Sequence, residues 1–571
     1  LAASGCKELL MHRMFFAIVS SIAVQFLLVT CLILITNLST DYALWLQNTW
    51  ATVTSLRMWS YFCILATVTF FQGIICSKSY LSTPKYLKSR FIKFCGIFTS
   101  QNILLCILHI VIGGLMVWLH LSVKGGKYSS LTVKCSTIYG TCLVEEHYFL
   151  LLSGFWTGLY LFINTTAFHV KYLKFPIISL SKFFRFKTEI YSMLPSVMIN
   201  SIWPTLYYLC GYYFMGSYCR GTMLFLTSTQ LEVEPLDCIT RLMNLSLVLH
   251  IWLYQLIFKL TINSMYLLFE LYLTKWVSFE FKQSNVFDNN DAGITLPEVL
   301  SMDKIPIMQH LGYLDLVILA QKQKGRRNII FTLSQPGGHP YNWNCIVEKC
   351  IDCIMKFSND LSTASVKIQE PPGPVPSGTT QVTDTLQKQY LYHMRSLMSK
   401  KPCLPKETYS EDVQNNKILI QRFITTKWQG FLAYLLSKPL INYIFGELEG
   451  NRVCHILFHG QCVIWAAEAI SSLSVLSLNE DSYGIVQKDL PVIIDTLLGL
   501  KQALDKLQKS SILIKKQEGD DKFIKQIVTS LRAATKRSLY RIVTNFEMYI
   551  NDLALESTTL EQLHNFLSYR E

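Results

Sequence analysis

Charged side chains are scarce in this sequence of 571 residues. Asp, Glu, Lys and Arg together make up 16% of it, against roughly 25% in a typical soluble protein. Hydrophobic residues make up 51%, and the mean hydropathy is +0.29. This composition excludes a wholly soluble protein and indicates that a large part of the chain lies in lipid.

Catalytic and nucleotide-binding motifs are also missing. The sequence contains no Walker loop, no dinucleotide fingerprint after a strand, no His-Glu-x-x-His, no Gly-x-Ser-x-Gly and no kinase signature. We find no cluster of acids, bases or metal ligands that would suit a membrane-bound acyl- or glycosyltransferase. The sequence therefore predicts no enzyme, no cofactor and no metal site.

The net charge of +13 is concentrated in the first half of the chain. Residues 1–269 contain 19 Lys and Arg against 8 Asp and Glu, whereas residues 270–571 contain 33 against 31. Because the excess falls among apolar runs, the basic loops of a membrane protein explain it better than phosphate binding does. We expect no direct contact with nucleic acid.

Six apolar stretches are long enough to cross about 30 Å of hydrocarbon as helices of roughly 20 residues. They lie near residues 14–36, 58–77, 103–123, 148–168, 190–215 and 242–262. The fifth contains Pro195 and Pro204, so we expect it to be kinked. The predicted fold class is an all-α polytopic membrane protein, with six spans in residues 1–269 followed by a cytosolic helical domain. The chain starts at Leu1 and not at Met, so we also expect its true N-terminus to be missing.

Basic residues in the loops predict the orientation of these spans. The loop between the second and third spans carries five basic residues and no acid, and the loop between the fourth and fifth carries five against Glu189 alone. The other loops are close to neutral. Since basic loops stay in the cytosol, both termini are predicted to be cytosolic or to face the pore.

Four cysteines fall in the loops that this topology places in the lumen. Cys135 and Cys142 share one loop, and Cys219 and Cys238 share another. An oxidising lumen permits disulfides at these positions. The seventeen cysteines as a whole are too scattered for a disulfide scaffold.

Ionisable residues inside the spans keep a second class of function open. His109, His250 and Lys259 would suit a transporter or channel if they met around a shared cavity. We favour structural roles. Lys259 lies near the cytosolic end of its span, where it can reach the headgroups, and histidines in membranes commonly form hydrogen bonds between helices.

The second half of the chain reads as helical. We divide it into a first helical segment at residues 270–364, a flexible linker rich in Pro, Gly and Thr at residues 365–384, and a C-terminal helical domain at residues 385–571. Residues 453–476 are apolar enough to suggest a seventh span. Polar residues such as His455 and Glu468 interrupt them, which favours a core helix.

Two amphipathic helices are candidate surfaces for the membrane or a partner. In residues 425–447 the apolar face includes Trp428, Phe431, Leu432, Leu435 and Leu436. In residues 521–554 the polar face includes Lys525, Arg532, Lys536, Arg537 and Arg541. The alternatives are a core helix in the first case and a solvated face in the second.

A rigid turn precedes a helix near residue 341. Its residues are Pro336, Gly337, Gly338, His339 and Pro340, which cannot continue a helix or a central strand. Asn342 is predicted to cap the helix that contains Trp343. Cys350 and Cys353 fall on its apolar face, so we interpret them as core residues and not as zinc ligands.

Three stretches resemble the nuclear division cycle family of transmembrane nucleoporins. They are FTLSQPGGHPYNWNCI at residues 331–346, YLKFPIISLSKFFRF at residues 172–186 and PLDCITRLMNLSLVLHIWLYQL at residues 235–256. The similarity covers nearly the whole chain. One departure is the stretch after Ser365, which is shorter than the Ser/Pro-rich linker of the animal members.

The resemblance implies a protein of the nuclear pore membrane that anchors the pore scaffold and supports pore assembly. The partners it implies are the lipid bilayer, inner-ring scaffold nucleoporins, the propeller nucleoporin aladin and other pore-membrane proteins. The family offers no catalytic residues, and the Pro336–Trp343 motif transfers as a structural signature.

Overall fold

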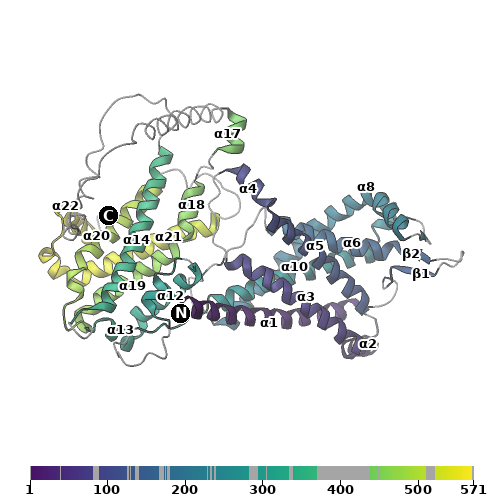
Figure 1. The fold of residues 1–571 in the computed structure, drawn as a ribbon, viewed down its shortest axis with the longest axis horizontal. Helices are drawn as coiled ribbons and strands as arrows, with labels where there is room; N and C mark the ends of the chain where they lie inside the picture. The colour runs from purple at the N-terminus through teal and green to yellow at the C-terminus, as the bar shows by residue number, and fades with distance from the viewer. Residues whose placement is uncertain are drawn as a thin grey trace, which may run out of the picture.

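The computed structural model describes residues 2–38, 40–81, 89–124, 128, 130–134, 141–165, 173, 175, 181–227, 229–231, 235–236, 239–281, 294–303, 305–333, 338–369, 438–446, 450–509 and 521–568. The molecule is elongated, with a bundle of long helices at one end and a second helical domain at the other (Figure 1).

Helices that lie roughly side by side build the bundle. The long ones are α1 (Ala2–Thr36), α3 (Leu56–Leu81), α5 (Ser100–Lys124), α6 (Glu145–Ile163), α7 (Lys182–Asn200), α8 (Ile202–Thr227) and α10 (Leu245–Leu273). Shorter helices lie between them: α2 (Tyr42–Thr54), α4 (Arg90–Ile97) and α9 (Ile239–Leu242). The prediction of an all-α polytopic membrane protein is confirmed.

Within the described residues, five helices are long and apolar enough to cross a membrane. Four of them, α1, α3, α5 and α10, coincide with predicted spans. The predicted fourth span corresponds to α6, a helix of 19 residues with Glu145 and Glu146 in its first turn, which falls outside this group. The fifth candidate is α19 (Gly460–Glu480), which belongs to the C-terminal domain.

The predicted fifth span is divided between α7 and α8, and Ser201 between them keeps a helical backbone conformation and donates to the Val197 carbonyl at 3.0 Å. Pro204 lies in the first turn of α8, where its missing N–H removes a bond to the preceding turn and favours a kink or break at this point. Pro195 is accommodated inside α7.

Glycines bring α5 and α6 into close contact. A Cβ on Gly113 would overlap the carbonyl oxygen of Gly154, and a Cβ on Gly158 would overlap that of His109. Small residues spaced four apart on α6 therefore let the two backbones approach, which is how helices commonly associate in lipid.

Three short strands lie at the end of the bundle farthest from the C-terminal domain (Figure 1). β1 (Thr132–Lys134) pairs antiparallel with β2 (Thr141–Leu143), and β2 pairs in parallel with β3 (Gln230–Leu231). Val133 lies opposite Cys142 in this sheet. The all-α prediction did not foresee these strands, because each has only two or three residues.

The second helical domain combines the predicted first helical segment with the predicted C-terminal domain, and we use the name C-terminal domain for both together. Its described part contains helices and 3-10 turns. They are α11 (Leu296–Leu300), α12 (Pro306–Lys322), α13 (Lys324–Ile330), α14 (Tyr341–Gln369), α17 (Pro439–Phe445), α18 (Asn451–Phe458), α19, η2 (Val486–Lys488), α20 (Leu490–Lys509), α21 (Asp521–Asn545), η4 (Glu547–Asp552) and α22 (Ser557–Leu567). α14 continues to Gln369, so the first five residues of the predicted 365–384 linker are helical instead. The rest of that linker lies outside the described residues.

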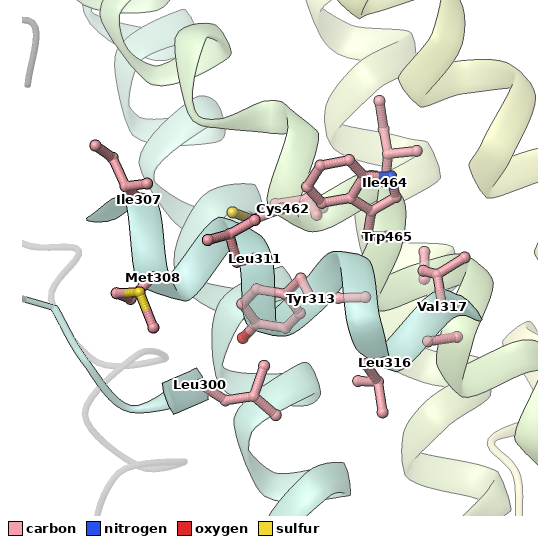
Figure 2. Packing of buried hydrophobic residues seen from close by; sticks show 14 of the residues in the cluster. Leu300, Ile307, Met308, Leu311, Tyr313, Leu316, Val317, Cys462, Ile464 and Trp465 are labelled. Carbon is pink, nitrogen blue, oxygen red and sulfur yellow. The ribbon is translucent and has the colours of Figure 1, made fainter. Parts of the chain in front are cut away.

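α19 lies at the centre of this domain, in contact with α12, α14 and α21. Figure 2 shows Leu311 of α12 beside Cys462 of α19. Two-thirds of the apolar window of α19 is buried inside the protein. The contacts favour a core helix over a seventh span.

Candidate functional site: the joint between the bundle and the C-terminal domain

The C-terminal domain packs directly onto the ends of the bundle helices. One cluster of buried hydrophobic residues includes Leu10 of α1, Phe269 of α10 and Leu311 of α12. The Cys6 thiol of α1 also contacts the sulfur of Met302 at 3.6 Å. We call this region, formed by the start of α1, the end of α10, residues 274–281 and helices α11 and α12, the joint. α1 therefore begins and α10 ends at the same end of the bundle.

Asp315 is the centre of a buried polar network in the joint. This fully buried carboxylate of α12 accepts hydrogen bonds from Trp276 Nε1 at 2.9 Å and from the Phe279 backbone N–H at 3.0 Å. Arg326 donates to both of its oxygens, at 3.0 and 2.7 Å, and also donates to the Phe279 carbonyl. A buried charge of this kind is costly once it loses a partner, so the network fixes the segment after α10 against α12.

Two arginines hold the end of α10. Arg185 of α7 donates to Glu270 at 2.6 Å and to the Thr274 hydroxyl at 3.1 Å. Arg13 of α1, itself buried, donates to the Leu273 carbonyl at 3.0 Å. The last carbonyls of a helix lack partners within the helix, and these cations satisfy one of them and favour the negative end of its dipole.

A second pair of polar contacts braces the interior of the domain. Arg327 of α13 forms a two-bond ion pair with Glu480 of α19, at 2.8 and 3.0 Å, and both side chains are buried. These hydrogen bonds raise the pKa of Arg327 and lower that of Glu480. Trp343, which is fully buried, donates from Nε1 to Asp489 at 2.9 Å.

The turn before α14 is built as a rigid entry to this core. Gly338 adopts a φ of 65°, in the left-handed region that favours glycine. His339 Nε2 lies 3.1 Å from Asn344 Nδ2. Asn342 does not cap the helix, because α14 already begins at Tyr341; its Nδ2 instead donates to the Ile329 carbonyl at 3.3 Å. Of the expected signature, Pro336 and Gly337 lie outside the described residues.

The Cys-x-x-Cys pair lies in the core as interpreted. Cys350 is fully buried, and burial raises its pKa well above the ordinary thiol value. Burial also raises the pKa of Cys353 to about 11. Tyr313 packs beside them and donates to the Lys349 carbonyl at 3.1 Å. Among the described residues, no three His, Cys, Asp or Glu side chains are grouped so as to hold a metal.

The far end of the bundle has its own buried network. Glu145 accepts hydrogen bonds from Arg220 at 3.0 Å, from the Tyr212 hydroxyl at 3.1 Å and from the Leu236 backbone N–H at 3.0 Å. These contacts join α6 and α8 close to the short sheet. This network fixes the start of α6 against the middle and second half of α8.

The expected cysteine bridges can be compared with the structure in part. Cys142 is disulfide-bonded, and its partner lies outside the described residues. Cys219 is a free thiol, so it takes no part in the disulfides that the lumen would permit. Cys135 and Cys238 themselves lie outside the described residues.

The two histidines of the spans each lie within hydrogen-bond distance of a carbonyl of their own helix. His109 Nδ1 lies 2.7 Å from the Leu105 carbonyl, and His250 Nδ1 lies 2.6 Å from the Ser246 carbonyl. His250 and Lys259 stand nine residues apart on α10, or about 13 Å along its axis. The contacts of the two histidines are those of structural residues.

The structure describes the two candidate surfaces to different extents. Trp428, Phe431, Leu432, Leu435 and Leu436 all lie outside the described residues. The end of that segment, α17, contacts α4 of the bundle: the Arg90 guanidinium lies 3.8 Å from the Tyr443 ring centre, and the Phe91 and Phe445 rings are 4.7 Å apart.

On α21, three of the five basic residues bind within the chain. Arg532 pairs with Asp505 at 3.2 Å, Arg537 pairs with Glu468 at 2.8 Å, and Arg541 donates to the Ser472 hydroxyl. Lys525 and Lys536 are exposed. The basic face available to a partner is therefore narrower than the sequence pattern indicated.

Sequence reasoning missed the residues of the joint. Asp315 is the only acid in α12 and lies within its apolar stretch at residues 311–320, and a lone acid on a buried face is a usable signal for a buried polar network. Arg185 stood inside the stretch YLKFPIISLSKFFRF but was counted only as loop charge. Its partner Glu270 lies 85 residues away, and spacing alone cannot reveal such a pair.

Comparison with known proteins covers almost the whole chain. The family model described as Nucleoporin protein Ndc1-Nup matches residues 8–564. The nucleoporin NDC1 of Mus musculus is 26% identical over 662 residues, which covers 98% of this chain and 96% of the relative. The human protein of the same name is 26% identical and covers 92% of each, and nucleoporin Ndc1 of Drosophila melanogaster is 26% identical and covers 99% of each. These relatives are named as nucleoporins and not as enzymes. The chain belongs to the Ndc1 family of nucleoporins.

Proposed function

We propose that the chain tethers nuclear pore scaffold proteins to the pore membrane and supports pore assembly, with the bundle fixed in the bilayer and the C-terminal domain binding the scaffold. The joint is the observation that carries this proposal. The domain shares a hydrophobic cluster with the bundle, and Asp315 and Arg185 pin the chain between them. A domain held at one orientation lets several weak contacts add through effective concentration.

We further propose that both ends of the chain face the cytosol or the pore. This is supported by the contact between Arg13, near the start of α1, and Leu273, at the end of α10, because it requires an even number of crossings between them. Tags at the two ends should become accessible to protease together when only the plasma membrane is permeabilised. Access to one tag alone would contradict the proposal.

The partners we propose are inner-ring scaffold nucleoporins, the propeller nucleoporin aladin and other pore-membrane proteins, besides the lipid bilayer. Lys525 and Lys536 of α21 are the basic residues we assign to a partner surface, since the neighbouring arginines are engaged within the chain. The apolar face at residues 425–447 stays a prediction.

Crosslinking in intact nuclear envelopes tests the tether. Lysine-reactive crosslinks to scaffold nucleoporins are expected on exposed lysines of the proposed partner surface, Lys525 and Lys536. The control is Lys134 of β1, at the opposite end of the molecule, which should give none. Crosslinks confined to the bundle would contradict a scaffold-binding role for the domain.

A charge-reversal pair tests the surface itself. We expect Lys525→Glu with Lys536→Glu to reduce co-purification of scaffold nucleoporins from gently solubilised envelopes, because opposed charges slow and weaken association. Lys322→Glu with Lys488→Glu changes the net charge equally at exposed sites on α12 and η2 and should leave recovery unchanged. Equal recovery for both pairs would remove α21 from the partner surface while leaving the tether open to the crosslinking test.

A further inference from the structure

A cavity of about 500 Å³ lies at the bundle side of the joint. Its walls come from the first turns of α1, the start of α7, and the end of α10 with the residues that follow it. This size is within the usual range of small-molecule sites. The cavity lies where α1 and α10 reach the C-terminal domain, at or beyond the ends of the spans that the sequence predicts at residues 14–36 and 242–262.

The polar side of this cavity carries positive charge. Arg13, Lys182 and Lys275 line it together with His12, and none of the described residues that line it is a carboxylate. Partial desolvation lowers the pKa of Lys182, and the neighbouring charges of Lys275 and Arg13 lower it further. The three cations therefore repel one another and would gain from a shared anion.

The acids of the surrounding elements are directed elsewhere or lie outside the cavity. Glu270 of α10 and Glu189 of α7 both bind Arg185, at 2.6 and 2.9 Å. Glu8, the only acid of α1, is an exposed side chain one turn before His12. Ser181, which precedes α7, makes no capping bond, and the first turn of α7 has no acid, so the positive end of its dipole adds to the field at Lys182.

The other side of the cavity is aromatic and apolar. Phe16, Tyr272 and Trp276 line it, and the Lys182 ammonium lies 4.5 Å from the centre of the Tyr272 ring. Next to it, Phe15 of α1 and Phe183 of α7 expose more than half of their surface. Aromatic side chains beside cations are typical of the membrane interface, and the exposed rings offer a path for acyl chains.

We propose that this cavity binds the phosphate-bearing headgroup of an anionic membrane lipid. Arg13, Lys182 and Lys275 bind the phosphate, and Phe16, Tyr272 and Trp276 contact the glycerol and upper acyl chains. Basic pockets at the cytoplasmic ends of membrane helices are suited to such headgroups. The inference depends on membrane insertion of the bundle and not on the proposed scaffold tether, so either can fail without the other.

A photoreactive lipid provides the first test. The full chain is reconstituted into phosphatidylcholine nanodiscs that contain a small fraction of photoreactive phosphatidylinositol phosphate, and the crosslinked peptides are mapped. Crosslinks are expected on the start of α1, the start of α7 and residues 272–277. Crosslinks spread evenly over the lipid-facing helices would overturn the proposal, without any variant being needed.

Matched lysine pairs provide the second test. Each exposed Lys near an anionic surface contributes about 1 kcal/mol, so Lys182→Gln with Lys275→Gln should weaken binding of that lipid about thirtyfold by native mass spectrometry. The control, Lys7→Gln with Lys187→Gln, removes the same charge from exposed positions on α1 and α7 that do not line the cavity. Equal losses in the two pairs would refute a specific site.

Soluble anions distinguish the source of the phosphate. Inorganic phosphate and a soluble inositol phosphate lack acyl chains, so they should compete only weakly with the lipid. Displacement of the lipid by inorganic phosphate at concentrations comparable to that of the lipid would assign the cavity to a free anion and overturn the lipid proposal.

Discussion

The bundle and the C-terminal domain differ in where their apolar side chains lie. In the bundle, α1, α5 and α8 expose residues such as Phe15, Leu104 and Phe225. In the C-terminal domain, α12, α14 and α20 bury residues such as Leu311 and Leu497. Burial of apolar surface in water can hold the domain together. It cannot hold the bundle together, because lipid is as apolar as the helices themselves. Close backbone contacts between α5 and α6 and polar contacts such as Glu145 with Arg220 hold it instead.

The joint combines both means of stabilisation and should be the most sensitive place in the molecule. Replacing Asp315 with Ala removes the acceptor of the buried Phe279 N–H, of the Trp276 indole N–H and of the half-buried Arg326 guanidinium. Breaking a pair that is buried on both sides costs about 3–5 kcal/mol, and the cost here should be at or below the lower end of that range because Arg326 is partly exposed and keeps Gln323 and the Phe279 carbonyl as acceptors. We expect a markedly lower thermal unfolding midpoint for the full chain in detergent, with faster proteolysis near residues 275–281.

Asp352→Ala is the control for that experiment, because Asp352 is an exposed carboxylate on α14. The Asp352→Ala chain should have the same thermal unfolding midpoint as the parent chain. If Asp315→Ala also keeps the parent midpoint, then the two halves are joined by the hydrophobic cluster alone.

The second prediction concerns the bundle only. Gly158→Ala places a methyl group against the His109 backbone, which cannot move aside as a side chain would. Overpacking typically costs about 1–3 kcal/mol, and here it should separate α5 from α6. Gly211→Ala on α8 meets nothing within 4 Å and should be tolerated. Equal unfolding temperatures for the two variants would show that α5 and α6 do not depend on close backbone contact.

Long-range pairing marks the limit of what the sequence could predict. Four of the spans were recognisable because length and apolar composition suffice to define them, and the core position of Cys350 followed from helical periodicity. Locating the break at Ser201 requires the position of Pro204 within a helical turn. Identifying the joint requires pairs such as Arg185 and Glu270, which are far apart in the chain. The lone Asp315 in α12 was a signal that could have been used.

A third prediction concerns the C-terminal domain and the dependence of its stability on pH. His310 of α12 stacks on Phe175 at 5.0 Å, and burial lowers its pKa to about 4. Above pH 6.5 the imidazole is neutral in both states. Between pH 6.5 and 4 the unfolded chain takes up a proton that the folded domain excludes, so the free energy of unfolding falls as the pH falls, by about 1–3 kcal/mol for this partly exposed ring.

His310→Phe should flatten that dependence, as measured by thermal unfolding between pH 6.5 and 4.5. Some slope should remain, since burial also lowers the pKa of His459. The control is His564→Phe, at an exposed position on α22. A slope that His310→Phe leaves unchanged would assign the acid sensitivity to other groups.

The smallest effect is expected at the surface of the domain. Arg537 pairs with Glu468 at 2.8 Å, but 66% of the arginine side chain is exposed, and pairs of this kind contribute about 0–1 kcal/mol. Arg327 makes a similar pair with Glu480 in which both side chains are 8% exposed, so its loss leaves a buried carboxylate. The unfolding temperature of Arg537→Ala should therefore be close to that of the parent chain, and that of Arg327→Ala should be well below it. If the two variants have the same unfolding temperature, then exposure does not set the strength of ion pairs in this domain.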